Sequence, residues 1–352
     1  MDKILITGGA GFVGANLAIF LRKEFPGCRI IALDNLSRPG SDLNLNRLKA
    51  FSVDFVRGDV RNPEDFVRFE DIDLIIDAAA EPSVLAGIKE GPKELIDINF
   101  GGTINCLELA RKQNSKFIFL STNRVFAYPA LNDITFIEDE NRYEYDPTTP
   151  YYQQGINETF TSNGLKSFYG ASKLASELLI QEYAYQFNIP AIVNRCGVIA
   201  GPWQMGKVDQ GFFAWWVAAH YFDIPLNYIG FGGMGKQVRD VLHIEDLCRL
   251  IKLQIADGFH LNYEYSNVGG GWKNSISLKE LSDLTSKITG KTTMLNSIAE
   301  TRPVDVRIYY TDNHKIGEKY AWTPTKSIQD TLNDVFYWIQ ENESIAQKIF
   351  LP

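Results

Sequence analysis

The sequence is poor in cysteine and histidine, the usual ligands of transition metals. There are only four cysteines, far apart, with no CxxC motif and no Cys/His pair: Cys28, Cys106, Cys196 and Cys248. Because each stands among apolar residues, we predict buried, reduced thiols and no metal site.

Basic residues are also in the minority. Lys and Arg number 35 against 43 Asp and Glu, which gives a net charge of -8. Nucleic-acid binding needs clustered basic side chains, so this balance argues against a nucleic-acid partner. An anionic substrate would have to be held by a few local basic residues.

Long apolar runs, internal repeats and low-complexity tracts are missing as well. No stretch is long and apolar enough to cross a bilayer, which argues against a membrane partner. The first residues enter a strand pattern at once, without the pattern of a signal peptide. We therefore expect a cytoplasmic protein.

Over its first two thirds, the sequence alternates short apolar runs with longer amphipathic segments. The runs are nearly continuous in apolarity, as in strands buried on both faces. The predicted strands are Lys3–Thr7, Arg29–Asp34, Val53–Arg57, Leu74–Ala78, Lys116–Ser121 and Ala191–Cys196, and the predicted helices are Phe12–Glu24, Glu94–Asn114 and Tyr169–Phe187. This alternation predicts an α/β fold with a Rossmann-type, doubly wound parallel sheet.

Beyond about residue 200 the pattern is looser, and Gly and Pro are frequent. We predict a smaller, mixed α/β lid that binds the substrate. Its helices are expected at Gly211–Tyr221, Ile244–Asp257, Ser277–Thr289 and Ser327–Glu341. The expected domains are residues 1–199 with 236–270, and residues 200–235 with 271–352. Ala127–Lys166 is predicted to be a long loop, and long ordered loops are often functional.

The sharpest local signal is the glycine-rich turn that covers residues 7–14, TGGAGFVG. Gly8 permits a tight turn, Gly11 lets the backbone approach a pyrophosphate, and Gly14 allows close packing of helix on strand. The helix that begins at Phe12 and Val13 offers N–H donors and a positive dipole end to phosphates. The turn therefore predicts dinucleotide binding.

Asp34 ends the second predicted strand, about twenty residues further on, where such folds bind the ribose. A carboxylate at this position accepts hydrogen bonds from both ribose hydroxyls and repels a 2′-phosphate. This favours NAD over NADP. Arg38 lies close by in the sequence and could soften the preference.

Tyr169 and Lys173 open a predicted helix at a four-residue spacing, which places them on one face. A free phenol, with a pKa of about 10, is a poor base, but a nearby ammonium and the nicotinamide charge favour the phenolate. Tyr169 can then take a proton from a sugar hydroxyl while hydride leaves the same carbon. Ser121 and Thr122 end the fifth predicted strand, and spacing alone allows either to hydrogen-bond the substrate oxygen.

These residues and several stretches resemble the extended short-chain dehydrogenase/reductases, which include sugar-nucleotide epimerases, dehydratases and decarboxylases. The stretches are the glycine-rich turn, Asp34, Gly58–Arg61, Ala78–Ala80, Asn99–Thr103, Ser121–Asn123 and Tyr169–Lys173. Within this group, the sequence is most similar to 2-epimerases of CDP-linked 3,6-dideoxyhexoses, on Asp34–Arg38, Ser121–Val125, Asp209–Gly211 and Gly235–His243. The resemblance covers essentially the whole chain.

The resemblance implies NAD as the cofactor and a nucleotide sugar as the substrate. It implies Thr122 as the catalytic hydroxyl, Tyr169 as the base and Lys173 as the catalytic lysine. The implied cofactor contacts are Gly8, Gly11, Phe12, Val13, Asp34, Asn35, Ser37, Arg38, Asp59, Val60, Ala78, Ala79, Ala80, Asn99, Ser121, Tyr169 and Lys173. The implied substrate contacts are Thr122, Asn123, Gln210, Arg239 and Arg302, with both arginines on the diphosphate.

Three positions depart from the residues usual in this group. Phe126 stands in place of Tyr, Phe168 in place of Pro, and Val198 in place of a polar residue, often Asn. Relatives commonly associate through paired helices. We therefore expect a homodimer or homotetramer formed by the helices at Glu94–Asn114 and Tyr169–Phe187.

Two residues separate the possible reactions. Dehydratases and decarboxylases of this group carry an acidic residue just after the catalytic hydroxyl, where this sequence has Asn123 and Arg124. Neither can act as that acid or base, so we expect epimerisation with NAD retained. A 4-epimerase or a net reductase acting on another nucleotide sugar is the alternative. A non-catalytic nucleotide sensor is disfavoured because the catalytic hydroxyl, tyrosine and lysine are all present.

Overall fold

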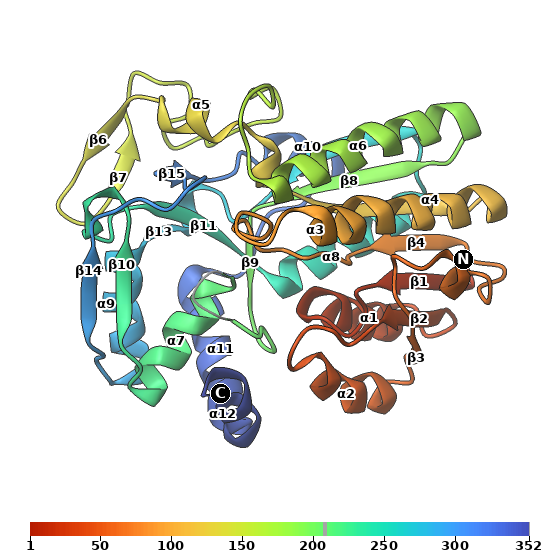
Figure 1. Ribbon diagram of the computed structural model, residues 1–352, viewed down its shortest axis with the longest axis horizontal. Helices are drawn as coiled ribbons and strands as arrows, with labels where there is room; N and C mark the ends of the chain where they lie inside the picture. The colour runs from red at the N-terminus through yellow and green to blue at the C-terminus, as the bar shows by residue number, and fades with distance from the viewer. Residues whose placement is uncertain (207–209, 352) are drawn as a thin grey trace. The chain divides into compact units, whose positions relative to one another are not determined.

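The structure is a computed structural model that describes residues 1–206 and 210–351 (Figure 1). Its largest sheet has seven strands. The strands are β1 (Lys3–Thr7), β2 (Arg29–Asp34), β3 (Asp54–Arg57), β4 (Leu74–Asp77), β5 (Lys116–Thr122), β8 (Ala191–Cys196) and β12 (Tyr263–Val268). Their order is β3-β2-β1-β4-β5-β8-β12, and the pairs from β3 to β5 are parallel. The strand order changes direction between β1 and β4, as in a doubly wound Rossmann sheet, so the predicted fold class is confirmed.

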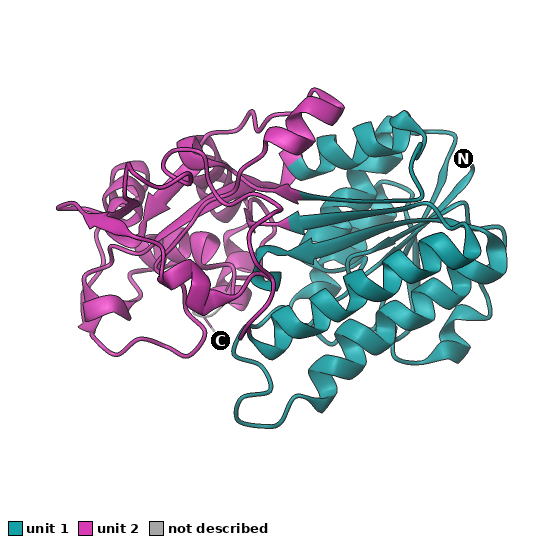
Figure 2. Cartoon of the chain, turned by 90° about the horizontal axis from the view of Figure 1, so that it is seen from above, with its two compact units in different colours: residues 1–125, 167–195, 247–266 teal, residues 126–166, 196–246, 267–352 magenta. Residues whose placement is uncertain are grey.

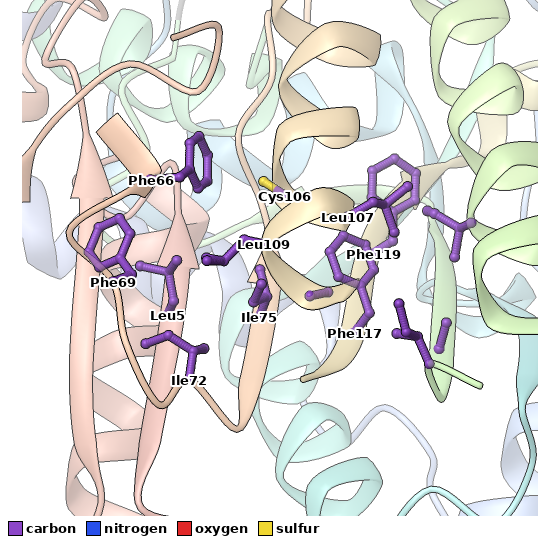
Figure 3. Close-up of a cluster of buried hydrophobic side chains, with 14 of the residues drawn as sticks. Leu5, Phe66, Phe69, Ile72, Ile75, Cys106, Leu107, Leu109, Phe117 and Phe119 are labelled. Atoms are coloured by element: carbon purple, nitrogen blue, oxygen red, sulfur yellow. The ribbon is translucent and has the colours of Figure 1, made fainter. Parts of the chain in front are cut away.

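Helices cover both faces of this sheet, which is why its strands are apolar throughout. On one face, β1, β4 and β5 pack against α4 (Gly102–Gln113) and α6 (Phe168–Phe187). Figure 3 shows this core, with Phe117 and Phe119 of β5 near Leu107 of α4. On the other face, α1 (Phe12–Glu24) contacts β1 and β2, and α8 (Ile244–Asp257) bonds to β8.

The helix predicted over residues 94–114 is not one regular helix. It consists of α3 (Lys93–Ile96), a π-helical segment η3 (Asp97–Gly101) and α4. The wider turn contains Asn99, and π-helical turns of this kind are frequent at functional sites. The prediction of a helix is confirmed, but its interruption was not predicted.

The described residues form two compact units, which Figure 2 shows in different colours. Unit 1 comprises residues 1–125, 167–195 and 247–266, and unit 2 comprises residues 126–166, 196–246 and 267–352. The expected NAD-binding and substrate-binding domains are assignments of function and stay predictions. In the described part of the chain, every helix is too short or too polar to span a bilayer. The same residues contain no group of three or more His, Cys, Asp or Glu side chains placed to hold a metal ion.

Unit 2 contains a smaller mixed sheet, as the sequence predicts. It is formed by β9 (Val198–Ala200), β11 (Val238–His243), β13 (Ser275–Ser277) and β15 (Ile308–Tyr309). Elsewhere β10 (Leu226–Ile229) pairs with β14 (Leu295–Ile298). The helices of this unit are α7 (Phe212–Phe222), α9 (Leu278–Thr289), α10 (His314–Tyr320), α11 (Ile328–Glu341) and α12 (Glu343–Phe350). All but α10 contribute to a core around Phe213, Trp216 and Leu332.

The prediction of a long loop over residues 127–166 is wrong in part. The segment contains α5 (Tyr128–Asn132) and a hairpin of β6 (Phe136–Glu138) and β7 (Tyr143–Tyr145). Further along, the Ile156 N–H donates to the Tyr310 carbonyl at 2.9 Å. Gly155 has φ 97°, and a Cβ there would lie 2.6 Å from the Thr311 carbonyl carbon, so this approach requires glycine. These partners lie far away in the sequence, which is why the local pattern did not reveal the structure.

Candidate active site

The glycine-rich turn brings strand, helix and neighbouring backbone into close contact. Gly8 has φ 62°, and a Cβ there would lie 2.8 Å from the Ala78 carbonyl oxygen. A Cβ at Gly14 would lie 2.2 Å from the Gly8 carbonyl oxygen, whereas one at Gly11 would meet that oxygen at 3.1 Å. The backbone is therefore tightly packed at Gly8 and Gly14 and more open at Gly11, which is compatible with the predicted roles.

Helix α1 begins directly after this turn, at Phe12 and Val13. Its N-cap is Gly11, its first turn carries no acidic residue, and no described side chain caps it. The N–H groups and dipole of this helix end are thus arranged to bind an anion. The arrangement fits the pyrophosphate of a dinucleotide.

Asp34 lies at the end of β2 and is half-buried. Its Oδ2 accepts a hydrogen bond from the Ala10 N–H at 3.1 Å, and its Oδ1 accepts one from the Leu36 N–H at 2.8 Å. Burial raises the pKa of Asp34, and these N–H groups act in the opposite direction. Each carboxylate oxygen can accept more than one hydrogen bond, so the group fits a ribose diol as well as the turn.

Asn35 and Asp59 link the ends of β2 and β3. The Asn35 Nδ2 donates to Asp59 Oδ2 at 2.9 Å, and its Oδ1 accepts from the Ser37 N–H at 2.9 Å. Arg61 binds both oxygens of Asp59, at 3.0 and 2.7 Å, and this pairing lowers the pKa of the carboxyl. The Val60 carbonyl accepts from the Asn105 side chain at 2.8 Å.

A network of hydroxyls holds the backbone after β4. The Thr7 hydroxyl donates to Asp77 at 2.7 Å and accepts from the Ala78 and Ala79 N–H groups at 3.2 Å. Thr103 also donates to Asp77, at 2.8 Å. Asn99 is buried, and its amide bonds the Glu81 backbone at 2.8 and 3.1 Å. Asn99 therefore holds the segment after Ala80, and its predicted contact with the cofactor stays a prediction.

These groups follow the ends of neighbouring parallel strands, so they share one edge of the sheet. Gly8 follows β1, Asp34 ends β2, Asp59 follows β3, and Ala78 follows β4. Arg38 lies in the turn after β2, where its carbonyl accepts from the Ser41 hydroxyl at 2.8 Å. Unit 1 thus brings together the predicted cofactor residues.

Tyr169 and Lys173 lie one turn apart on α6, which begins where Ser167 caps the helix by accepting from the Gly170 N–H at 3.0 Å. Lys173 is 2% exposed, and its ammonium lies 4.2 Å from the centre of the Phe119 ring. A buried cation beside an aromatic face is stabilised by the ring quadrupole. Lys173 is therefore held in the interior on the same helix as Tyr169.

The structure separates the two candidate hydroxyls on β5. The Ser121 hydroxyl donates to Glu177 Oε1 at 2.5 Å. The Thr122 hydroxyl lies 3.4 Å from Asn123 Oδ1 and accepts from the Arg124 N–H at 3.2 Å. Ser121 has committed its one proton to a carboxylate, whereas Thr122 holds a long hydrogen bond that a ligand could replace. This difference favours Thr122 as the catalytic hydroxyl.

Glu177 and Arg195 were missed as functional candidates. Arg195 of β8 donates from Nη2 and Nε to Glu177 Oε2 at 2.7 and 3.0 Å and from Nε to Glu177 Oε1 at 3.2 Å, with side chains 9% and 2% exposed. A signal was present, because Glu177 stands four residues after Lys173, on the same face of the predicted helix.

The predicted substrate arginines of unit 2 differ in their surroundings. Arg239 is 8% exposed and donates to Asp305 at 2.8 Å and to the Val238 carbonyl at 2.7 Å. It also donates to the Val306 carbonyl. Arg302 is half-buried, and its guanidinium pairs with no carboxylate within the described residues. Arg302 therefore has more capacity than Arg239 for a new anion.

Two further predicted substrate residues lie in different units. Asn123, in unit 1, is 8% exposed and follows Thr122 directly. Gln210, in unit 2, is half-buried and precedes α7, while the neighbouring Asp209 lies outside the described residues. The substrate roles of Asn123 and Gln210 stay predictions.

The fold agrees with the comparisons with known proteins. Residues 4–269 match the model of the NAD dependent epimerase/dehydratase family, and the chain belongs to this family. It is an NAD-dependent nucleotide-sugar epimerase/dehydratase, and the prediction of NAD as its cofactor is confirmed.

Among its relatives, the CDP-paratose 2-epimerase of Salmonella typhi is 33% identical over 96% of this chain and 98% of its own length. The UDP-glucuronate 4-epimerase of Thermodesulfobacterium geofontis is 28% identical over 99% of both chains. The solved UDP-glucuronic acid 4-epimerase of Bacillus cereus, in complex with UDP-glucuronic acid and NAD, has a TM-score of 0.80 and 25% identity over 96% of this chain and 99% of its own.

Proposed function

We propose that the protein is a CDP-paratose 2-epimerase, which interconverts CDP-paratose and CDP-tyvelose. The similarity to the Salmonella typhi enzyme over nearly the full length of both chains supports this assignment. The single observation that carries an epimerase is the contrast between Ser121 and Thr122. It leaves Thr122, which is followed by the non-acidic Asn123 and Arg124, as the hydroxyl that acts with Tyr169 and Lys173.

In the proposed reaction, Tyr169 as phenolate takes the proton from the hydroxyl at C2 of the sugar. Thr122 donates a hydrogen bond to the same oxygen, and Lys173 favours the phenolate by its charge. NAD, held at the glycine-rich turn and Asp34, would supply the hydride acceptor for C2 and the donor for its return to the opposite face. Tyr169 then gives the proton back to the oxygen, so the redox balance is zero and the cofactor need not leave.

In the cofactor site, Asp34 would accept hydrogen bonds from the adenosine ribose of NAD, and the N-terminus of α1 would hold its pyrophosphate. Arg302 binds the diphosphate of the substrate through its planar guanidinium. Asn123 and Arg124, which follow Thr122, carry no carboxyl group to remove water from the oxidised sugar. The reaction therefore stops at inversion.

Proton NMR of the purified protein with CDP-tyvelose in heavy water, without added cofactor, tests the assignment. CDP-paratose should form with no deuterium at C2, because the hydride returns from bound NAD. No conversion by protein that retains NAD would contradict the CDP-tyvelose assignment. Steady oxidation of added NADPH would contradict epimerisation and favour a reductase.

A 4-epimerase is the second candidate function. It is supported by the similarity to the Bacillus cereus UDP-glucuronic acid 4-epimerase, with a TM-score of 0.80. A panel of UDP-, GDP- and dTDP-hexoses in the same NMR assay distinguishes the two. Inversion at C4 of one of these, with CDP-tyvelose unchanged, would replace the first assignment.

We also propose that the protein forms a homodimer or homotetramer through α6. Leu178 and Tyr185, seven residues apart on this helix, are 60% and 58% exposed, and Phe187 is 47% exposed. Apolar side chains at this spacing form a stripe that a second helix can cover. Light scattering should give a multimer for the wild type and a smaller species for Leu178→Glu; a monomeric wild type would contradict the proposal. The cytoplasmic location stays a prediction.

A further inference from the structure

The end of β5 is joined to α6 at three points, all within unit 1. Lys173 lies over the Phe119 ring, and Ser121 donates to Glu177. At the start of the helix, a Cβ at Gly170 would lie 2.1 Å from the Arg124 carbonyl oxygen, so the two backbones are in direct contact. Along β5 and the turn that follows it, Thr122 lies between the contacts made by Ser121 and Arg124.

The Glu177 carboxylate is itself fixed by a second strand. Arg195 Nη2 donates to its Oε2 at 2.7 Å, and Arg195 Nε donates to its Oε2 and Oε1 at 3.0 and 3.2 Å. The Arg195 guanidinium lies 4.4 Å from the centre of the Tyr265 ring. A bidentate pair held against a ring has little rotational freedom. The Ser121 hydroxyl therefore binds an acceptor whose position is set by α6, β8 and β12 together.

From this geometry we infer that Ser121, Glu177 and Arg195 are positioning residues for catalysis. They fix the position of Thr122, at the end of β5, relative to Tyr169, on α6. The inference rests on the proposed function to the extent that Thr122 and Tyr169 act on the same substrate oxygen.

The chemistry of the reaction explains why these positioning contacts are useful. Two groups on different elements must reach one oxygen, and a misplacement of about 1 Å can cost on the order of 100-fold in rate. A carboxylate is a strong acceptor that holds the serine hydroxyl, and Arg195 neutralises it. The charges of Glu177 and Arg195 cancel, so the pair adds little net charge near the Tyr169 phenol and does not oppose formation of the phenolate.

Ser121→Ala is the direct test, because it removes the link and leaves the Glu177–Arg195 pair in place. We expect kcat to fall about tenfold while KM stays within about twofold and bound NAD is retained, the pattern of an interaction that matters in the transition state. An unchanged kcat would overturn the inference.

A double-mutant cycle with Thr122→Ala separates positioning from general support of the fold. If Ser121 acts through Thr122, Ser121→Ala should cause no further loss of kcat in the Thr122→Ala background. A loss as large as in the wild-type background would overturn the inference.

A buried polar pair elsewhere on β8 supplies the matched control. Asn194 and Gln254 exchange two amide hydrogen bonds at 3.0 and 2.8 Å, and both are fully buried. Gln254→Leu should lower the melting temperature and leave kcat unchanged. A fall in kcat equal to that of Ser121→Ala would show that any softening of unit 1 has the same effect, and would overturn the inference.

The cycle is run on the first nucleotide sugar, from a CDP-, UDP-, GDP- and dTDP-linked panel, that the wild type converts. Conversion of another sugar, with CDP-tyvelose unchanged, overturns the proposed substrate. The ratios between variants still decide whether Ser121 acts through Thr122, so the two failures are distinguishable.

Discussion

Arg239 and Asp305 form an ion pair at 2.8 Å in unit 2, so the charge of this arginine is already balanced within the fold. Asp305 also accepts a hydrogen bond from the Val306 N–H at 2.8 Å, which fixes the carboxylate. The two arginines expected to hold the diphosphate therefore have different partners, and substitution should affect them differently.

Arg302→Ala should raise KM for the nucleotide sugar at least tenfold with little change in melting temperature, because it removes a charge-assisted contact to the substrate. Arg239→Ala should instead lower the free energy of unfolding by about 1–3 kcal/mol, because it leaves the half-buried Asp305 carboxylate and the Val238 and Val306 carbonyls without their donor. Steady-state kinetics and thermal melts measure both effects. An unchanged KM in Arg302→Ala would remove this residue from the substrate site.

Gly14→Ala should abolish most NAD binding. A Cβ there would lie 2.2 Å from the Gly8 carbonyl oxygen, so α1 has to move away from the turn, at a cost of about 1–3 kcal/mol. Absorbance of the released cofactor measures NAD content. Gly27→Ala is the control, because no atom lies within 4 Å of its added Cβ. Equal NAD content in both variants would contradict the role of the turn.

Tyr169→Phe should lower kcat by a factor of about 10²–10⁴ and retain NAD, because it removes the proton-transfer group alone. Tyr183 lies on the same helix and offers a matched phenol. It donates to Glu108 at 2.7 Å, and its burial and this carboxylate raise its pKa to about 12. Tyr183→Phe should keep kcat near the wild-type value. Comparable rates for the two variants would show that Tyr169 is not the base.

Unit 2 should lose stability in mild acid. Burial lowers the pKa of His220 below its ordinary value of 6.5, while its Nδ1 lies 2.8 Å from the Trp216 carbonyl. Below pH 6.5 this histidine is protonated in the unfolded chain but stays neutral in the folded chain. The free energy of unfolding therefore decreases as the pH is lowered, by up to about 1.4 kcal/mol per pH unit.

Urea unfolding followed by tryptophan fluorescence at pH 7.5 and 5.5 measures this effect in unit 2, which contains all six tryptophans. His220→Gln should reduce the difference between the two pH values. His260→Gln should not, because that side chain is 74% exposed. The same pH dependence in wild type and His220→Gln would assign the loss to other groups.

The sequence predicted best what neighbouring residues determine. β1, β2 and α1 have the bounds expected, because apolar runs buried on both faces and a glycine-rich turn leave strong local patterns. The hairpin of β6 and β7 was missed because distant partners hold its segment, such as the Arg142 side chain on the Ser275 hydroxyl at 2.8 Å. Contacts of this kind leave no periodicity in the sequence.

The candidate site shows the same division. The four-residue spacing of Tyr169 and Lys173 is a local pattern, and it singled out both as candidates. The choice between Ser121 and Thr122 was left open by spacing because it depends on Glu177, 56 residues further along the chain than Ser121. Likewise, the engagement of Arg239 by Asp305 depends on β11 meeting a segment 66 residues away.

The division of the chain into units has a consequence for its synthesis. The polypeptide passes from one unit to the other at residues 126, 167, 196, 247 and 267, so neither unit is a continuous stretch. A ribosome has to release residue 266 before unit 1 is complete, and β12, the edge strand of its sheet, arrives last. Until then the outer edge of β8 is an unpaired strand, which makes this edge the place where a chaperone is most useful to the nascent chain.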